Sequence, residues 1–412
     1  MTTQITTQEE LDALLERMRT EAWRELALLY VYARDPASWR GQLSADSWSV
    51  DRIFVLAPGL AKPELWGRVP PSVQSLAVTG LGLGDGDARA IAEHLAGLKS
   101  LDLEFNQIGE AGARAIAEHL TGLTSLDLGY SQIGEAGARA IAEHLAGLTS
   151  LDLGYNQIGE AGAQAIAEHL TGLTSLDLGG NGIGDAGARA IAGHLTGLKS
   201  LDLELNQIGD AGARAIAEHL AGLTSLDLEY NGIGEGGARA IAKHLTSLTA
   251  LSLAGNKIGE AGARAIAKHL TSLTALSLAG NKVGEAGAQA IAEHLPSLMA
   301  LNLRNNRIGD AGAQAIAEHL FGLMSLGLAG NRIGAVPAAF GDSRALRWLD
   351  LSGNDIATLP RELGRSRSLQ YVFLHENERL EIPDQLLGEE AVGLGDDWSP
   401  PNAPAILQWL AS

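Results

Sequence analysis

The chain has 412 residues, among them 51 glycines and no cysteine, and only 4% of its residues are aromatic. This composition does not fit an ordinary globular protein with a core of mixed aliphatic and aromatic side chains. The formal net charge of −19 argues against nucleic acid and anionic membranes as main partners, because both are polyanions. Without cysteine the chain has no disulfide, thiolate zinc site or thiol nucleophile, and its short apolar runs predict a soluble cytoplasmic protein.

Residues 1–72 differ from everything that follows and are predicted to form an N-terminal helical cap. Thr7 and Glu10 have the spacing of a capping box, and an apolar stripe with helical spacing follows them. The stripe consists of Leu11, Leu15, Met18, Ala22, Leu26 and Leu29. Farther on, Val50, Ile53 and Val55 fit a degenerate first coil of the repeat that begins next. Because the open end of a stack of repeats exposes apolar core, a cap is expected here, and a separate partner-binding helix is the alternative.

From Val73 onward the chain repeats itself every 25 residues, a period typical of stacked architectures. One unit, LKSLDLEFNQIGEAGARAIAEHLTG, runs from Leu98 to Gly122. Long units begin at Val73, Leu98, Leu123, Leu148, Leu173, Leu198, Leu223, Leu248, Leu273 and Leu298, and the units from Leu323, Leu346 and Leu369 have a spacing of 23. All seven tryptophans lie outside residues 73–322, which indicates that the two ends are built differently.

Each unit is predicted to contain one strand and one helix. Leu101 and Leu103 alternate with polar residues, as in a strand with one buried face. Ala113, Ile116 and Leu120 fall on one face of a helix. Neither element can bury its apolar side alone, so the units must stack into a parallel sheet covered by parallel helices. Since strands lie about 4.8 Å apart and packed helices about 8 to 10 Å, the stack is expected to curve with its sheet on the concave side.

The pattern LxxLxLxxNxIG followed by a helix resembles the leucine-rich repeat family, in its ribonuclease-inhibitor-like subclass, over about residues 73–390. The resemblance implies an α/β leucine-rich repeat solenoid, a horseshoe with a parallel concave sheet, convex helices, an N-terminal helical cap and a C-terminal capping helix. Three domains follow from it. They are the cap with its degenerate first coil (1–72), the solenoid (73–391, with 25-residue units to 322 and 23-residue units after) and a connector with a C-terminal helix (392–412).

The same resemblance implies a ladder of buried asparagines that hydrogen-bond the backbone of neighbouring coils. The matching positions are Asn106, Asn156, Asn181, Asn206, Asn231, Asn256, Asn281, Asn306, Asn331, Asn354 and Asn377, and Leu81 and Ser131 interrupt the ladder. The short units, with Val336-Pro337 and Leu359-Pro360, resemble the LPxxL subclass, whose convex side is flatter than a helix. Curvature is therefore expected to relax after about residue 335.

Two repeated features resemble metal or phosphate chemistry, but each has a structural explanation. Histidines recur at one position of the unit, as at His119, and lie about 10 Å apart, too far to share a zinc ion with ligands at about 2.0 to 2.1 Å. Gly109 and Gly112 form a glycine-rich turn before a helix, but Glu110 within it would repel a phosphate. No GxxxxGK[ST] motif occurs. We therefore expect no catalytic residue, no metal, no cofactor and no bound nucleotide.

The concave strand face carries the candidate binding site. Asp102 and its counterparts in the next five units share one outward position, so their carboxylates should line up about 4.8 Å apart, an unfavourable arrangement for like charges. Residues 98–247 contain 8 basic and 19 acidic residues, whereas residues 248–332 contain 7 and 5. The candidate partner-binding residues are Asp102, Glu104, Phe105, Asp127, Tyr130, Asp152, Tyr155, Asp177, Asp202, Glu204, Asp227, Glu229 and Tyr230.

Three interpretations of this acidic stripe stay open. It is a docking surface for a basic segment, because aromatic residues beside charges are typical of contact patches. Alternatively, the aspartates were copied with the duplicated units and are simply solvated. A calcium site is the third, but strand-borne carboxylates lack the loop carbonyls that complete a calcium shell. Around and beyond Ser252 the face carries small residues that a partner's backbone can approach closely, namely Ala250, Ala254, Ala275, Ser277 and Ala279.

The stretch from Leu374 to Leu410 resembles the segment that joins the repeats to the GTPase domain in bacterial Roco proteins. The resemblance lies in an irregular coil with IPxxLLG, a polar proline-rich connector and PAIL before an aromatic residue. Asn402 and Pro404 have the pattern of the start of a short helix. The resemblance implies that a Ras-like GTPase and a dimerising module follow in a longer protein. Since the chain ends at Ser412, where such a GTPase would begin, we expect a fragment.

Together these patterns predict a non-enzymatic scaffold for protein binding, the regulatory arm of a bacterial Roco-type GTPase that acts in signalling. Its acidic concave face would dock a basic or neutral surface of a protein partner or of a neighbouring domain of the same assembly. Nucleic acid and membrane are not expected partners. The alternative is a free-standing leucine-rich repeat inhibitor or host-directed binding protein. A P-loop soon after residue 412 in the reading frame would favour the first interpretation, and a stop codon would favour the second.

Overall fold

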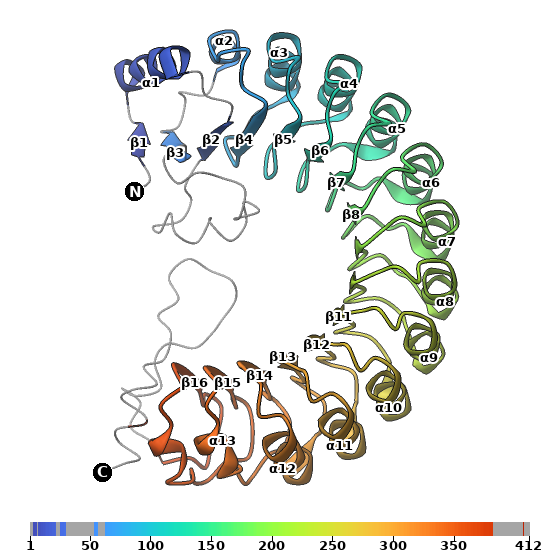
Figure 1. Ribbon diagram of the computed structural model, residues 1–412, viewed down its shortest axis with the longest axis vertical. Helices are drawn as coiled ribbons and strands as arrows, with labels where there is room; N and C mark the ends of the chain where they lie inside the picture. The colour runs from blue at the N-terminus through green and yellow to red at the C-terminus, as the bar shows by residue number, and fades with distance from the viewer. Residues whose placement is uncertain are drawn as a thin grey trace. The chain divides into compact units, whose positions relative to one another are not determined.

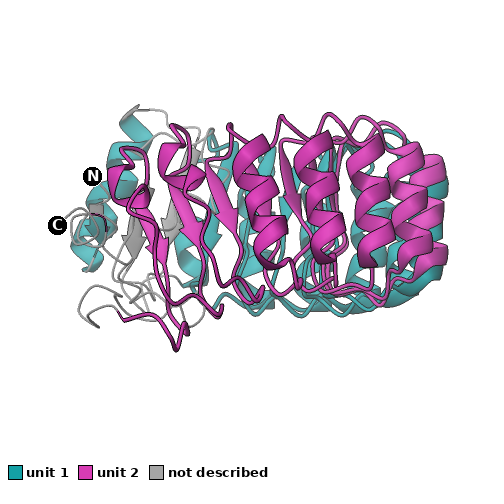
Figure 2. Cartoon of the chain, turned by 90° about the horizontal axis from the view of Figure 1, so that it is seen from below, with its two compact units in different colours: residues 1–198 teal, residues 199–412 magenta. Residues whose placement is uncertain are grey.

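The computed structural model describes residues 3–5, 7–21, 25–29, 53–56, 62–381 and Leu407. The chain divides into two compact units, Met1–Leu198 and Lys199–Ser412, which Figure 2 shows in different colours. Each unit repeats the predicted coil of one strand, one turn and one helix, and the parallel sheet with helices on its other side is confirmed. None of the helices among the described residues is long and apolar enough to cross a membrane.

The first unit begins with helix α1 (Gln8–Glu21) and strands β1 (Thr3–Ile5), β2 (Glu25–Leu29) and β3 (Ile53–Leu56), which extend the sheet in the order β1-β3-β2-β4. The capping box is present: Thr7 Oγ1 accepts from the Glu10 amide at 3.2 Å, and Glu10 Oε2 accepts from the Thr7 amide at 3.0 Å. The helix ends at Glu21, so the prediction that Leu26 and Leu29 continue its stripe is wrong. These two residues lie in β2, because the short apolar run Glu25–Leu29 pairs with β3 on one side and with β4 on the other.

Several predicted features of the two ends lie outside the described residues. Ala22 and Val50 are among them, and so is the connector with its C-terminal helix, apart from Leu407, which is helical and buried. Leu11, Leu15 and Met18 of the predicted stripe are buried within α1.

The rest of the first unit is regular (Figure 1). Its strands are β4 (Ser75–Thr79), β5 (Ser100–Asp102), β6 (Ser125–Asp127), β7 (Ser150–Asp152) and β8 (Ser175–Asp177), and its helices are α2 (Pro63–Trp66), α3 (Asp85–His94), α4 (Glu110–His119), α5 (Gly134–His144), α6 (Gly159–His169) and α7 (Gly184–His194). Neighbouring strands pair in parallel with a register of one coil, as in Leu101 with Leu126 and Leu126 with Leu151. These leucines are 1% exposed, so the core lies between sheet and helices.

The second unit continues the same pattern. Its strands are β9 (Ser200–Asp202), β10 (Ser225–Asp227), β11 (Ala250–Ser252), β12 (Ala275–Ser277), β13 (Ala300–Asn302), β14 (Ser325–Gly327), β15 (Trp348–Asp350) and β16 (Tyr371–Phe373), and its helices are α8 (Asp210–His219), α9 (Glu235–His244), α10 (Gly259–His269), α11 (Gly284–His294), α12 (Gly309–His319), the short α13 (Ala339–Asp342) and the 3-10 turn η3 (Leu363–Arg365). The 23-residue coils thus replace an eleven-residue helix such as α12 with segments of three or four residues.

The acidic residue in the first turn of each helix determines how the next helix begins. Where it is aspartate, as at Asp85, its Oδ1 accepts from the amides of Gly109 (2.8 Å) and Gly112 (2.9 Å) in the next coil. Asp210 binds Gly234 and Gly237 in the same way. The carboxylate therefore satisfies amides at a helix N-terminus that would otherwise lack partners.

Where the residue is glutamate and an arginine follows four residues on, the longer side chain instead pairs with that arginine, as Glu110 does with Arg114 at 2.7 Å. The next helix then starts one residue earlier, at a glycine with positive φ. Gly134, at φ +62°, donates its amide to Asn156 O at 3.0 Å, whereas Gly109 after an aspartate has φ −100°. One glycine position therefore has two backbone states.

This difference predicts opposite outcomes for two otherwise matched substitutions. Gly134→Ala is expected to lower the free energy of unfolding by about 1 to 2 kcal/mol, because the left-handed conformation disfavours any Cβ even though nothing lies within 4 Å of it. Gly109→Ala is expected to change stability by less than about 0.5 kcal/mol, since its φ is ordinary and the nearest atom, Asp85 Oδ1, lies 3.4 Å away. Urea denaturation of both variants measures the difference. Equal losses of unfolding free energy in the two variants would contradict the inference that this glycine position adopts two different backbone conformations.

Candidate binding surface

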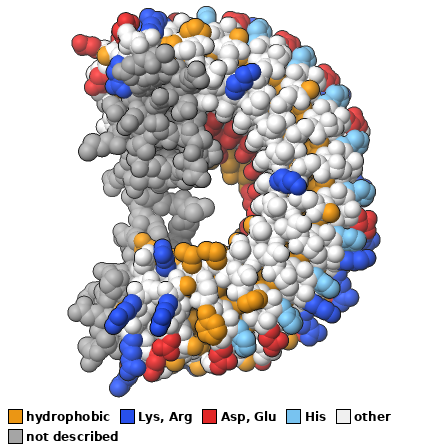
Figure 3. Space-filling model, viewed as in Figure 1, with side chains coloured by type: hydrophobic (Ala, Val, Ile, Leu, Met, Phe, Trp, Pro, Cys, Tyr) orange, Lys and Arg blue, Asp and Glu red, His pale blue; other side chains and the backbone are white. Residues whose placement is uncertain are grey.

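The solvent side of each unit's sheet, here called the strand face, carries the residues that the sequence singled out. In the first unit the register pairs Asp102 with Asp127, Asp127 with Asp152 and Asp152 with Asp177, so these four side chains form one continuous row. Figure 3 shows acidic side chains gathered on this side, while histidines follow the helices on the other side. The predicted alignment of the aspartates is therefore present in the described residues of the first unit.

Each aspartate of the row also has a local structural role that the sequence analysis missed. Its Oδ1 accepts a hydrogen bond from the backbone amide two residues on, at 3.0 Å for Asp102, 2.9 Å for Asp127 and 2.8 Å for Asp152. The bond closes the turn that follows the strand. Asn302, at the same position of a later coil, accepts from the Arg304 amide at 3.1 Å, so a neutral amide oxygen performs the same task.

The row is electrostatically strained because its members are partly buried and the charges around them are alike. Burial, followed by the charges of Asp177, Glu104 and Asp102, raises the pKa of Asp152 to about 8. Burial and the charges of Asp102 and Asp177 raise the pKa of Glu104 to about 7. Burial, with the charge of Asp152 next, also raises the pKa of Asp127 well above its ordinary value. With pKa values raised in this way the row holds protons near neutral pH, and a cation beside it would lower these pKa values so that the protons leave to solvent.

An aromatic stack lies beside the row. The rings of Phe105 and Tyr130 are stacked with centroids 4.4 Å apart, and those of Tyr130 and Tyr155 with centroids 4.3 Å apart. The ring of Tyr155 covers Gly180, where an added Cβ would come within 2.6 Å of it. Both faces of Tyr130 are thus covered, although 44% of the residue is exposed. The stack offers ring edges and hydroxyl groups to a partner rather than open ring faces.

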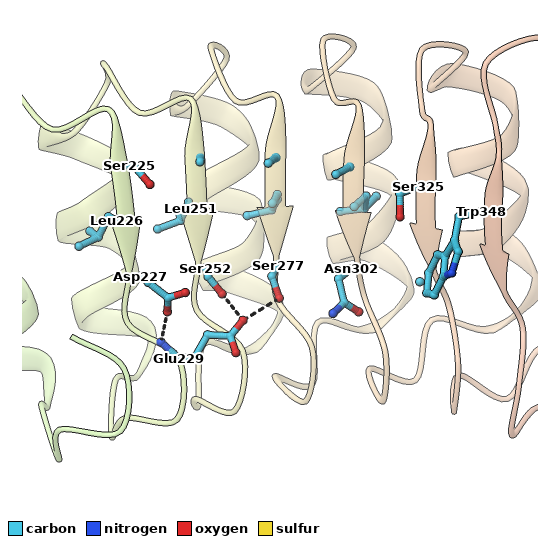
Figure 4. Close-up of a pocket in the computed structure, with 16 residues that line it drawn as sticks. Ser225, Leu226, Asp227, Glu229, Leu251, Ser252, Ser277, Asn302, Ser325 and Trp348 are labelled. Atoms are coloured by element: carbon cyan, nitrogen blue, oxygen red, sulfur yellow. Dashed lines mark hydrogen bonds between the residues drawn. The ribbon is translucent and has the colours of Figure 1, made fainter. Parts of the chain in front are cut away.

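The remaining predicted site residues lie in the second unit. Asp202 and Asp227 are paired in register, and each accepts from the amide two residues on, that of Glu204 at 3.0 Å and that of Glu229 at 2.8 Å. Glu229 Oε1 also accepts from the hydroxyls of Ser252 and Ser277, the latter at 3.3 Å (Figure 4). Tyr230 is 59% exposed, with its ring against Gly255.

The strand face of the second unit also contains a groove whose full extent the sequence analysis did not predict. Its volume is about 410 Å³. It is lined by Ser225, Leu226, Asp227, Glu229, Ala250, Leu251, Ser252, Ala275, Leu276, Ser277, Ala300, Leu301, Asn302, Ser325, Gly327 and Trp348. The small residues are evident from the sequence, whereas the tryptophans outside residues 73–322, Trp348 among them, indicate only that the ends of the chain are built differently. The available signal was its position in the unit, since Trp348 aligns in register with Ser325, and Ser325 with Ala300.

The asparagines of the predicted ladder link successive coils. Asn281, 1% exposed, donates from Nδ2 to Leu253 O at 2.7 Å and accepts at Oδ1 from the Ile258 amide at 3.1 Å. Ser131 occupies this position in the first unit, and its buried hydroxyl has no hydrogen-bond partner. The recurring histidines hydrogen-bond their own helices, as His119 Nδ1 does with the carbonyl four residues back at 3.0 Å. Among the described residues no group of His, Asp or Glu is arranged to hold a metal ion.

Comparisons with known proteins agree with this architecture. One family profile, Leucine rich repeat, matches residues 171–233, 296–356 and 321–378, and a second, Leucine Rich repeat, matches residues 97–117, 119–142, 147–167, 244–267 and 269–292. No curated protein sequence matches the chain. Among solved structures, the internalin InlF of Listeria monocytogenes is similar at 23% identity and a TM-score of 0.53, over 82% of this chain and 94% of that one.

A second solved structure is the leucine-rich repeat ectodomain of the Arabidopsis receptor kinase HAESA, determined in complex with an extended IDA peptide hormone. It is 19% identical with a TM-score of 0.49, over 79% of this chain and 55% of that one. At these identities the likeness to the internalin shows the fold alone.

Proposed function

Because the chain is a leucine-rich repeat protein, we propose that it is a protein-interaction scaffold whose first unit docks a basic surface of a partner on its strand face. The observation that carries this proposal is the row from Asp102 to Asp177. Burial, and then the acidic charges of its neighbours Asp177, Glu104 and Asp102, raise the pKa of Asp152 to about 8. A partner's lysine or arginine beside the row would stabilise the ionised carboxylates and relieve this repulsion.

The exposed edges of the aromatic stack extend this surface. Phe105 and Tyr130 lie one residue beyond the row's turns and are 38% and 44% exposed. Rings held rigidly by stacking lose little conformational entropy when a partner covers them. The stack therefore suits the apolar part of a contact whose charged part lies on the aspartates.

We further propose that the natural setting is cytoplasmic and that the chain serves as the regulatory arm of a Roco-type GTPase in bacterial signalling. The support is the sequence likeness between Leu374 and Leu410, together with the ribonuclease-inhibitor-like pattern of the long units. A free-standing inhibitor or host-directed binding protein is the second candidate, and the parent reading frame distinguishes the two.

A charge-neutral row is expected to bind basic ligands much more weakly. The probe is a labelled nonapeptide of alternating lysine and serine. The variant replaces Asp102, Asp127, Asp152 and Asp177 by asparagine. Asparagine still provides an oxygen that accepts from the backbone amide two residues on, as Asn302 does in its own coil. Affinity is expected to fall at least about ten-fold at low salt and to lose most of its salt dependence. Binding to the native chain should also strengthen from pH 6 to pH 8.5, because the raised pKa values of Glu104 and Asp152 mean that the row ionises in this range.

The matched control removes four negative charges from the helix side of the same unit, with Glu110, Glu135, Glu160 and Glu168 replaced by glutamine. These residues are on the helix surface, so net charge changes equally while the row stays intact. The control is expected to retain nearly native affinity. Equal weakening by both variants, or no weakening by the row variant, would show that the row is not a docking surface.

A further inference from the structure

The groove on the strand face of the second unit combines three different surfaces in a fixed order. Its floor is formed by Ala250, Ala275 and Ala300, which are paired in register on adjacent strands. Asp227 and Glu229 lie at one end, and the indole of Trp348 forms a wall at the other (Figure 4). Alanine side chains leave room for a partner's backbone to approach the sheet, so the groove suits an extended segment rather than a helix, which is about 10 to 12 Å wide with its side chains.

The acidic end is built to hold a cation at a defined place. Two hydroxyl hydrogen bonds, from Ser252 and Ser277, fix the Glu229 carboxylate over strands β11 and β12. Asp227 lies on the adjacent strand β10, in register with Ser252. A fixed carboxylate favours a basic side chain, above all the planar, bidentate guanidinium of arginine.

The opposite end offers an aromatic surface to an apolar or aromatic side chain. Trp348 is partly buried and lines the far end of the groove, and the centroid of its ring lies 5.2 Å from that of Phe373. The groove therefore has an acidic end and an aromatic end, and it should bind a segment in one direction only.

The spacing of the two ends limits the sequence that fits. From Ser277 on β12 to Trp348 on β15 is three strand separations across the sheet, about 14 Å, and two residues along the strands, about 7 Å, which makes roughly 16 Å in all. Four residues of extended chain span about 13 Å, and side chains four residues apart point to the same face. A basic residue and an aromatic residue at i and i+4 can therefore reach both ends together, because the long basic side chain covers the remaining distance of about 3 Å.

We propose that this groove binds an extended peptide segment of a partner protein that places arginine or lysine at Glu229 and an aromatic side chain against Trp348 four residues away. The inference goes beyond the proposed function of the first unit, because it concerns a different unit and a different ligand class. It shares no residue with that function, although Asp227 and Glu229 belong to the acidic stripe that the sequence predicts.

The test measures fluorescence anisotropy of short labelled peptides with the intact chain. The matching probe is acetyl-Gly-Arg-Ser-Ala-Ser-Phe-Gly-amide, and two control probes replace its arginine by glutamate or move its phenylalanine two residues closer. The matching probe is expected to bind at least about ten-fold more tightly than either control. Equal binding of the three probes, or no binding of the matching probe up to about 1 mM, would overturn the proposal.

Protein variants locate the bound peptide. Glu229→Gln, Trp348→Ala and Ala275→Leu are each expected to weaken the matching probe by about ten-fold or more, and Ala275→Leu does so by filling the groove without changing charge. Because Ala275 faces solvent in part, its variant should keep the native melting temperature. Native binding by Ala275→Leu would overturn the proposal. The double variant Asp127→Asn/Asp152→Asn in the first unit should bind the matching probe normally, so failure of the first unit's function and failure of the groove give different results.

Discussion

Replacing Asn281 by alanine is expected to lower the free energy of unfolding by about 3 kcal/mol, one of the largest effects of any single substitution in the chain. The side chain is 1% exposed, and its Nδ2 donates to the carbonyls of Leu253, Leu278 and Ala279 at 2.7 to 3.1 Å. Alanine removes these bonds and leaves the buried Ile258 amide without an acceptor, and an unsatisfied buried group costs about 1 to 3 kcal/mol when water cannot reach it. The three carbonyls keep one other donor each, so their lost bonds add less to the total.

The reverse substitution provides the matched control. Ser131 occupies the ladder position in the first unit, and its buried hydroxyl lacks a hydrogen-bond partner. Ser131→Asn is therefore expected to raise the free energy of unfolding by about 1 kcal/mol or more. Since a repeat array unfolds in parts, amide hydrogen exchange should be measured beside urea denaturation, and protection should change mainly in the coils next to the substitution. No change in either variant would show that the ladder does not stabilise the stack.

Neutralising the centre of the acidic row is expected to stabilise the protein at high pH and to have little effect at low pH. The pKa of Asp152 in the folded chain is raised from 3.8 to about 8, so the protonated form favours folding. This contribution is fully present below about pH 4 and is lost as the pH rises through about 8. The native chain should therefore lose stability between these values. Asp127→Asn/Asp152→Asn should remove most of this dependence and be about 2 kcal/mol more stable at pH 8.5.

Urea denaturation at pH 4 and pH 8.5 measures this difference. Asp127→Ala/Asp152→Ala serves as the control, because alanine removes the charge and also the acceptor for the amides of Gly129 and Gly154. The alanine variant should be less stable than the asparagine variant at both pH values. An asparagine variant that is less stable than the native chain at pH 8.5 would mean that the carboxylates have cationic partners in the folded state.

The coil itself could be predicted from the sequence because two periods alternate within 25 residues. Leu101 and Leu103 show the strand, and Ala113 and Ile116 show the helix, and both periods recur often enough to exclude chance. Where the repeat is absent, the same reasoning failed. Leu26 and Leu29 fit a helical stripe by spacing but lie in β2, because pairing with β4 decides the conformation of so short an apolar run.

The candidate site was predictable in position but not in detail. Alignment of the aspartates follows from the repeat, whereas their bonds to the following turn depend on backbone geometry that no spacing reveals. The groove depends on Trp348, which comes within reach of the alanine floor only because the last coils continue the register of the sheet. A single residue in an irregular coil, such as Trp348, is therefore hard to assign to a binding surface until the pairing of its strand is known.

The glycine that opens each helix has a consequence for how such a chain changes in evolution. Gly109 and Gly134 occupy one position of the coil and take different backbone conformations according to the acid in the preceding coil. Since glycine can adopt either conformation, any coil can follow any other without a junction that must be repaired. Unequal recombination between the repeated gene segments can therefore lengthen or shorten the array by whole coils, and each product keeps a helix start that fits its new neighbour.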